Sequence, residues 1–237
     1  YNMAKTLNLT LKVWRQENRE AKGRIETYAA KDIPVDASFL EMLDIVNEGL
    51  VKEGKEPIHF DHDCREGICG MCSLTINGIP HGPERQVTTC QLHMRKFKDG
   101  DTVWIEPFRA KAFPILRDLM VDRSALDRII ASGGYIDVRT GSAPNANNIA
   151  VEKVKADAAF DAAACIGCGA CTAVCTAGNL TEFNFRKVHT LVRRGEYEGA
   201  YEEMNKCMLC GKCRLVCPRG INTRGVVMLI KRKLGDF

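Results

Sequence analysis

The sequence predicts an α+β chain made of two domains, and three observations support that prediction. Apolar and polar residues alternate near the N-terminus with the period of a half-buried strand. The C-terminal half instead carries apolar residues at helical spacing. All twelve cysteines lie in three runs, one in the first half and two in the second. We therefore expect a sheet-and-helix domain over residues 1–112 and an α-helical domain over residues 113–237.

The first elements of the N-terminal domain follow from periodicity and capping. Apolar residues at every second position predict a strand over residues 7–13, and residues 25–29 predict the strand that returns. Ser38 and Glu41 have the spacing of a capping box, so a helix should begin there. Its apolar stripe consists of Phe39, Met42, Leu43, Val46 and Leu50.

Two further strands complete the expected sheet. Residues 73–76 predict a strand that ends at the turn signal Asn77-Gly78. Residues 103–106 predict a last strand before Pro107. Strands around one helix, with a cysteine loop placed before a hairpin, describe a β-grasp ferredoxin domain.

Helices are expected in the C-terminal domain. Ser124 and Asp127 should cap a helix that Gly133-Gly134 stops, and residues 140–148 have the composition of a surface loop. Two further stripes have helical spacing: Phe185, Val188, Leu191 and Val192, and then Val226, Val227, Ile230 and Leu234.

Each cysteine run has the spacing of iron–sulfur ligands. The first is a C-x4-C-x2-C loop with a detached fourth cysteine, which is the spacing of plant-type 2Fe–2S ferredoxins. The other two repeat the C-x2-C-x2-C-x3-C spacing of bacterial two-cluster ferredoxins, in which the fourth cysteine of each run binds the other cluster. Four ligands for each of three clusters would use all twelve cysteines.

The spacing therefore predicts three ligand sets. The 2Fe–2S cluster is expected on Cys64, Cys69, Cys72 and Cys90. A 4Fe–4S cluster is expected on Cys165, Cys168, Cys171 and Cys217. A further cluster is expected on Cys175, Cys207, Cys210 and Cys213. Because the fourth cysteines cross, cluster insertion should be coupled to folding of the second domain.

Disulfides and structural zinc are the alternative uses of so many cysteines. Disulfide frameworks belong to small secreted chains, and residues 4–14 lack the apolar segment of a secretory signal. Structural zinc usually takes two C-x2-C pairs that are a dozen or more residues apart. The tight spacing favours iron–sulfur clusters. No apolar run approaches the ~20 residues of a membrane helix, and a net charge of +4 does not indicate a nucleic-acid partner.

The two domains in this order resemble the iron–sulfur subunit of succinate dehydrogenase and fumarate reductase. The resemblance is closest over residues 59–90, which include the motif Asp63-Cys-Arg-Glu-Gly-Ile-Cys-Gly-Met-Cys72, and over residues 165–175. It implies an electron-transfer subunit, without a substrate site, between an FAD-containing dicarboxylate subunit and a quinone at a membrane anchor. It also implies a peripheral position on the cytoplasmic face of the cell membrane, in a respiratory chain linked to the tricarboxylic acid cycle.

Two departures from that family change what is expected. The family usually holds a 3Fe–4S centre last, with a non-cysteine residue where this chain has Cys210, so a 4Fe–4S cluster is favoured here. The alternative is a spare thiol beside a 3Fe–4S cluster. The family commonly has a proline after the position of Cys175 and tryptophans that help form the quinone pocket. Here Thr176 follows, and the only tryptophans are Trp14 and Trp104. A 4Fe–4S last cluster should have a lower reduction potential than a 3Fe–4S one. A lower potential suits menaquinone better than ubiquinone, and the missing tryptophans fit that acceptor.

A basic stretch and two functional alternatives complete the sequence-based picture. Residues 205–235 contain eight lysines and arginines and no acidic residue. This indicates docking on a membrane or anchor, or else a solvated face or a lining that balances negative clusters. One functional alternative is a related fumarate reductase with a thiol or disulfide acceptor. The other is a freestanding ferredoxin-like carrier, which a chain with two linked domains does not favour.

Overall fold

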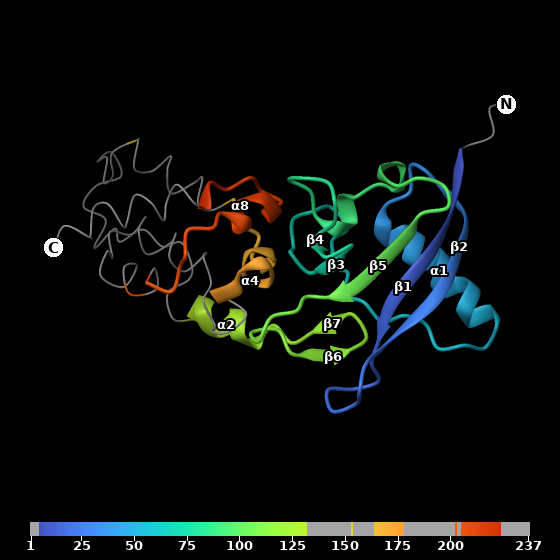
Figure 1. Cartoon of the computed structure of the whole chain (residues 1–237), viewed down its shortest axis with the longest axis horizontal. Coiled ribbons are helices and arrows are strands. Elements are labelled where there is room, and N and C mark those ends of the chain that lie inside the picture. The colour runs from blue at the N-terminus through green and yellow to red at the C-terminus, as the bar shows by residue number, and fades with distance from the viewer. Residues whose placement is uncertain (1–4, 132–152, 154–163, 178–201, 203–204, 224–237) are drawn as a thin grey trace, which may run out of the picture.

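The computed structural model describes residues 5–131, 153, 164–177, 202 and 205–223 (Figure 1). The expected loop over residues 140–148, the stop signal Gly133-Gly134 and the two later helical stripes lie outside the described residues. Figure 1 shows a sheet with one long helix at the N-terminal end, and short helices from the second half of the chain beside it.

A five-stranded mixed sheet forms most of the N-terminal half. Its spatial order is β2 (Arg24–Pro34), β1 (Thr6–Arg15), β5 (Thr102–Pro107), β3 (Leu74–Ile76) and β4 (Ile79–Pro80). Strand β1 is antiparallel to β2 and parallel to β5, and β3 is antiparallel to both of its neighbours. The first and last strands of this half therefore pair in the centre of the sheet.

The core lies between this sheet and helix α1 (Phe39–Lys52). The alternation predicted for the first strand is confirmed, because the side chains of Leu7, Leu9, Leu11 and Val13 are all buried. The capping box is confirmed as well: Ser38 Oγ accepts from the Glu41 N–H at 3.2 Å, and Glu41 Oε2 accepts from the Ser38 N–H at 2.5 Å. Every member of the predicted apolar stripe of this helix is buried.

The hairpin turn was also predicted correctly. Asn77 and Gly78 have φ of 50° and 78°, the left-handed values that a tight Asn-Gly turn requires. The second strand extends five residues beyond its expected end, to Pro34. Two 3₁₀ turns, η1 (Thr89–Gln91) and η2 (Met94–Lys96), lie before β5.

A small hairpin that the sequence did not reveal follows the sheet. Its strands are β6 (Ile115–Arg117) and β7 (Met120–Val121). The carboxylate of Asp118, buried at their turn, accepts from Arg15 Nε at 3.1 Å and from the backbone N–H groups of Gln16 and His59 at 2.9 and 3.1 Å. These bonds fix the hairpin to the end of β1.

Helix α2 (Ser124–Ala131) begins directly after this hairpin, and its predicted cap was wrong. Ser124 is the first helical residue, and Asp122 accepts from its N–H at 2.9 Å. Asp122 also pairs with Arg19 at 2.7 Å, which ties this corner to the β1–β2 connection. Asp122 thus supplies the capping contact two residues earlier than expected.

Each later cysteine run includes one short helix, α4 (Ala170–Val174) in the first and α8 (Lys212–Val216) in the second, and the two helices contact each other. A second apolar cluster joins Phe108, Phe113 and Val121 to Cys168, Ala170 and Val216, so residues on both sides of position 112 pack with the cysteine helices. Among the described residues, no helix has both the length and the apolar character needed to cross a membrane.

Candidate iron–sulfur sites

The loop over residues 64–72 turns its backbone N–H groups toward its sulfur atoms. Arg65, Gly67 and Gly70 have φ of 56°, 74° and 76°, which lets the chain wrap tightly. The Glu66 N–H donates to Cys64 Sγ at 3.3 Å, and the Met71 N–H donates to Cys69 Sγ at 3.5 Å. Donors aimed at sulfur stabilise thiolate ligands and influence the reduction potential of a cluster.

Neighbouring elements hold this loop in place. The Arg65 guanidinium pairs with the Asp44 carboxylate of α1 through both terminal nitrogens. The Arg65 carbonyl accepts from Gln91 Nε2 at 2.8 Å, and Gln91 directly follows Cys90 in η1. The loop and the detached fourth cysteine are therefore fastened to each other and to the packed core.

The four expected 2Fe–2S ligands are linked in pairs. The Cys72 thiol donates to Cys90, and this bond, followed by others that include Thr88, lowers the pKa of Cys90 to about 5. The same bond, together with burial, raises the pKa of Cys72. Backbone N–H groups, with Glu66 the strongest, lower the pKa of Cys64 to about 7. Cys64 also forms a hydrogen bond with the Cys69 side chain. These bonds thus favour the thiolate, which is the form that binds metal, at Cys64 and Cys90.

The two later runs share one backbone design. In each, a glycine after the second cysteine caps the short helix, with φ of 79° at Gly169 and 78° at Gly211. The third cysteine lies within that helix. The fourth, Cys175 or Cys217, is the residue that ends it. The predicted internal repeat is therefore a repeat of conformation as well as of spacing.

Electrostatic neighbours divide these eight cysteines into two groups. Burial raises the pKa of Cys171, and nearby thiols raise it further; Cys168, Cys165 and Cys217 belong to its own expected set, and Cys213 belongs to the other. Burial also raises the pKa of Cys213, and the thiols that add to this effect are Cys207, Cys175 and Cys210. In both groups the fourth cysteine comes from the other run. These are the crossed sets expected from the spacing, and cluster binding by each set stays a prediction.

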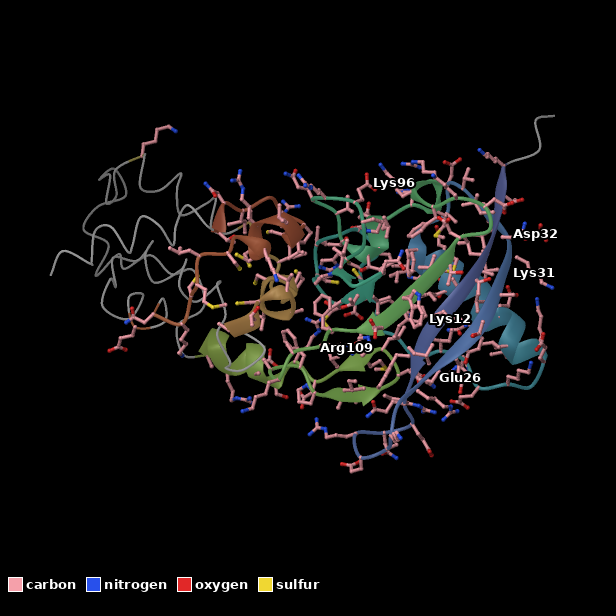
Figure 2. All side chains as sticks on the ribbon, in the orientation of Figure 1. Lys12, Glu26, Lys31, Asp32, Lys96 and Arg109 are labelled. Atoms are coloured by element: carbon pink, nitrogen blue, oxygen red, sulfur yellow. The ribbon has the colours of Figure 1, made fainter. Side chains whose placement is uncertain are left out.

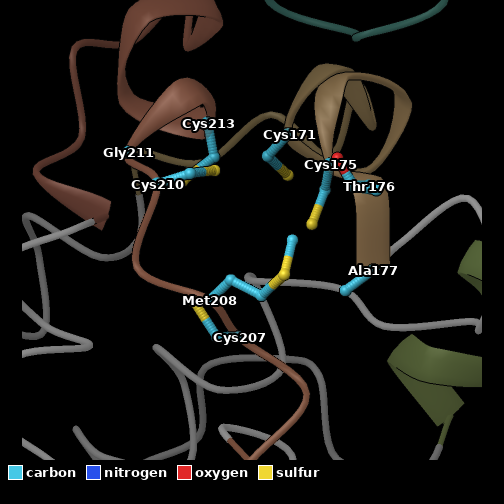
Figure 3. Close-up of a pocket in the computed structure, with 9 residues that line it drawn as sticks. All are labelled: Cys171, Cys175, Thr176, Ala177, Cys207, Met208, Cys210, Gly211 and Cys213. Atoms are coloured by element: carbon cyan, nitrogen blue, oxygen red, sulfur yellow. The ribbon is translucent and has the colours of Figure 1, made fainter.

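The last group surrounds a pocket (Figure 3). Its lining includes Cys175, Cys207, Cys210 and Cys213, and also Cys171 of the other group. Figure 3 shows the Met208 side chain reaching from one side of this pocket toward Cys175. In the described ranges no three His, Cys, Asp or Glu side chains converge closely enough to hold a single metal ion. The thiolates of a multi-iron cluster bind different iron atoms, so they do not need to converge on one point.

The first and second cysteine regions touch at what we call the loop junction, formed by Gly70, Met71, Ser73 and Cys168. A Cβ atom added at Gly70 would lie 2.6 Å from the Ile166 carbonyl oxygen and 3.0 Å from the Cys168 nitrogen. Ser73 Oγ lies 3.1 Å from the carbonyl oxygens of both Gly70 and Cys168. Its single proton can be donated to one of them at a time.

Sequence reasoning missed several residues of these sites. Thr88 Oγ1 lies 3.2 Å from Cys90 Sγ, and Ser73 joins the two loops at the junction. Arg123 donates to the backbone of both loops. No local signal marks Ser73 or Arg123, because their partners lie 95 and 45 residues away at Cys168.

Two family models match the chain in the order of its cysteine regions. A model described as "2Fe-2S iron-sulfur cluster binding domain" matches residues 10–128, which is half of the chain. A model described as "4Fe-4S dicluster domain" matches residues 161–221. The donor sets fit these groups, since thiols gather beside N–H donors in the first region and in two groups of four in the second. The chain therefore carries 2Fe–2S and 4Fe–4S clusters.

Relatives and a solved structure extend the similarity over nearly the whole chain. The fumarate reductase iron–sulfur subunit of Wolinella succinogenes is 24% identical, over 95% of this chain and 97% of that subunit. A fumarate reductase (CoM/CoB) subunit of Methanothermobacter marburgensis is 28% identical over 92% of this chain. A chain of the Mycobacterium smegmatis Sdh1 complex in the apo form matches with a TM-score of 0.80 at 21% identity, and 98% of this chain and 97% of that chain are covered.

Some relatives are much longer than this chain. It spans 42% of the length of the Methanothermobacter protein. It also spans 39% of an uncharacterized iron–sulfur protein of Methanocaldococcus jannaschii.

Proposed function

We propose that this chain, which belongs to the iron–sulfur subunit family of succinate dehydrogenase and fumarate reductase, relays electrons between an FAD-containing dicarboxylate subunit and a quinone at a membrane anchor. The chain is the iron–sulfur subunit of an oxidoreductase complex. When bound, its clusters accept and release single electrons. The chain's own residues supply the thiolates, the N–H donors and the fixed spacing between the sites.

The domain and ligand assignments are part of this proposal. We assign residues 1–112 to a β-grasp ferredoxin domain, which the mixed sheet packed against α1 supports. We assign residues 113–237 to a helical two-cluster domain, which the contact between α4 and α8 supports. The three ligand sets are those that the cysteine spacing predicts. The 2Fe–2S set is supported by its bonded pairs, and the two crossed sets are supported by their electrostatic grouping.

The observation that carries the relay is the continuity of the three cysteine groups. The first group meets the second where Gly70 packs against the backbone of Ile166 and Cys168. The second meets the third where Cys171 lines the pocket that the last group surrounds. A transient carrier needs one exposed site, whereas a series of sites in contact suits a fixed path between two partners. This continuity favours a relay subunit over a freestanding ferredoxin-like carrier.

The last cluster is proposed to be 4Fe–4S, because the backbone presents Cys210 as it presents Cys168. The residue before each of these cysteines is left-handed, with φ of 69° at Gly167 and 59° at Leu209. Leucine adopts this region at a cost of roughly 1–2 kcal/mol. Strain of this kind persists where the surrounding structure requires it, often at a functional site. The strained Leu209 thus supports Cys210 as a ligand.

A nuclearity measurement tests this assignment. EPR of the complex, isolated anaerobically before any oxidant is added, should show no stoichiometric three-iron signal. In Cys210→Ala such a signal should appear, with loss of one iron per chain by iron analysis. A three-iron signal already present in the unaltered protein, and unchanged in Cys210→Ala, would show that Cys210 is a spare thiol.

The proposed partners and location follow from the family. They are an FAD-containing flavoprotein, one or more membrane-anchor subunits, and a quinone, with menaquinone favoured, and the chain would be peripheral on the cytoplasmic face of the membrane. Purification of the native complex tests this. A flavoprotein should co-purify with this chain in a one-to-one ratio. Succinate should reduce the clusters only when that flavoprotein is present. Isolation as a monomer with full clusters would instead indicate a freestanding carrier.

A thiol or disulfide acceptor is the second candidate, and one region favours it. Cys210 is exposed and Met208 is 68% exposed beside the last cysteine group, so a partner can approach this group directly. One relative that carries the same two cysteine domains is named for CoM and CoB. Reoxidation of the reduced complex by a menaquinone analogue, but not by a mixed thiol disulfide, would favour the quinone.

A further inference from the structure

Arg123 lies where the first two cysteine regions meet, between β7 and α2. Its Nη1 donates to the Cys168 carbonyl at 3.2 Å. Its Nη2 donates to the Met71 carbonyl at 3.4 Å and to Ser73 Oγ. Met71 stands between two ligands of the 2Fe–2S set, and Cys168 is a ligand of the next set. One guanidinium therefore holds the backbone of both ligand loops.

The position of Arg123 is fixed from both sides along the chain. Asp122 caps α2 and pairs with Arg19, and Asp118 anchors the hairpin before it to β1. The Phe113 ring lies 5.8 Å from the Arg123 guanidinium carbon. A rigid corner thus presents this side chain to the loop junction.

The charge of Arg123 has no carboxylate partner among the residues that the structure describes. Asp61 interacts with it only from beyond ion-pairing distance. Its Nε is shielded from solvent and, within the same described ranges, has no hydrogen-bond acceptor. A shielded cation without a counter-ion is costly, so the fold requires negative charge nearby. Cysteine sulfur on both sides supplies most of the groups that can provide it: Cys168 interacts with Arg123 most strongly, Asp61 comes next, and Cys72 and Cys69 follow.

We propose that Arg123 is a positioning residue that joins the 2Fe–2S loop to the adjacent 4Fe–4S loop, and that its positive charge raises the reduction potentials of both clusters. A reduced cluster carries one more negative charge than an oxidised one, and a nearby shielded cation stabilises the reduced form more. Arg123 serves two sites at once because its planar fork reaches two carbonyls. This inference rests on the ligand sets given under the proposed function.

Anaerobic EPR redox titration of the purified complex tests this inference with three variants. Arg123→Met removes the charge and the fork. Arg123→Lys keeps the charge but cannot reach both carbonyls at once. Lys12→Gln is the charge-matched control, because the Lys12 ammonium makes a solvent-exposed hydrogen bond to Thr27 across the β1–β2 hairpin, where Figure 2 labels it.

Arg123→Met should lower the midpoint potentials of both clusters by more than Lys12→Gln does. Arg123→Lys should keep both potentials close to the unaltered values, but should weaken the magnetic interaction between the two reduced clusters, seen as easier power saturation of the 2Fe–2S signal. Unchanged potentials in Arg123→Met would overturn the inference. If the Arg123→Met complex does not assemble, the inference would be overturned by an Arg123→Lys complex whose 2Fe–2S signal has unaltered power saturation. The ligand sets are tested separately by Cys64→Ser, which reports on the presence of a signal and not on its potential.

Discussion

The first cysteine region and the two later runs hold their cysteine ligands in place in different ways. The loop over residues 64–72 is fastened to an extensive core of strands and α1 by Arg65, Asp44 and Gln91. Each later run has one helix of only five residues, and each group of thiols takes one member from the other run. We therefore expect the first site to be formed by a fold that does not depend on its cluster, and the second region to fold together with its clusters.

The largest expected effect comes from removing a fourth cysteine that one run contributes to the cluster of the other run. Cys217→Ser removes one ligand of the first 4Fe–4S set, and Cys217 is also the residue that ends α8, which carries part of the other set. Because the two runs hold each other, we expect loss of both C-terminal clusters rather than one. Iron analysis and EPR of the purified chain measure this directly. Retention of the last cluster at full occupancy would show that the runs are independent.

The opposite result is expected in the first region. Cys64→Ser should remove the 2Fe–2S signal and leave both C-terminal clusters in place, because the packed core that supports this loop does not depend on the ligand. The expected loss is the two irons of one cluster. EPR of the reduced variant beside the unaltered complex checks it. If Cys64→Ser also empties the C-terminal sites, the contrast between the two regions fails.

The same contrast explains what the sequence could predict. The alternation in β1, the capping box at Ser38 and the turn at Asn77-Gly78 were predicted because each is a local pattern with a local cause. The three cysteine sets were predicted because ligand spacing is imposed by the geometry of a cluster. The hairpin β6–β7 was missed, since its stability comes from contacts between Asp118 and distant residues.

The loop junction was beyond sequence reasoning for the same reason. Nothing near Arg123 in the chain distinguishes it from a surface arginine, and Ser73 looks like the start of a strand. Their roles depend on the approach of Cys168, which comes from another part of the fold. Likewise, Asp122 replaced Ser124 as the helix cap because Arg19, more than a hundred residues earlier, also holds it.

A glycine pair tests how tightly the two regions are joined. Gly70 and Gly78 have nearly equal φ, 76° and 78°, so an alanine at either carries similar strain, roughly 1–2 kcal/mol. A Cβ at Gly78 meets nothing within 4 Å, but a Cβ at Gly70 meets the Ile166 and Cys168 backbone. Gly70→Ala should therefore lower the resistance to urea more than Gly78→Ala, and should also weaken the magnetic interaction between the two reduced clusters. Equal effects of the two variants would mean that the junction is loose.

The smallest expected effect concerns His81, which follows β4 where that strand contacts α4. The Thr89 N–H donates to His81 Nδ1 at 3.3 Å, so the proton of the neutral ring lies on Nε2, which has no acceptor among the described residues. Burial, and then the charge of Arg123, lower the pKa of His81 to about 3.

The unfolded chain, with a histidine pKa near ~6.5, therefore binds more protons than the folded chain below that pH. The stability associated with the neutral ring is complete above pH ~6.5 and falls by up to ~1.4 kcal/mol per pH unit as the pH drops toward 3. His81→Asn keeps an acceptor for the Thr89 N–H but cannot titrate. Rates of unfolding in urea, followed anaerobically by the visible circular dichroism of the 2Fe–2S cluster, should rise less between pH 7.5 and 5.5 in His81→Asn than in the unaltered chain. The exposed His62, changed to Asn, is the control, and it should keep the unaltered pH dependence. If His81→Asn and His62→Asn show the same slope as the unaltered chain, His81 is not the group that makes the boundary between the two regions sensitive to acid.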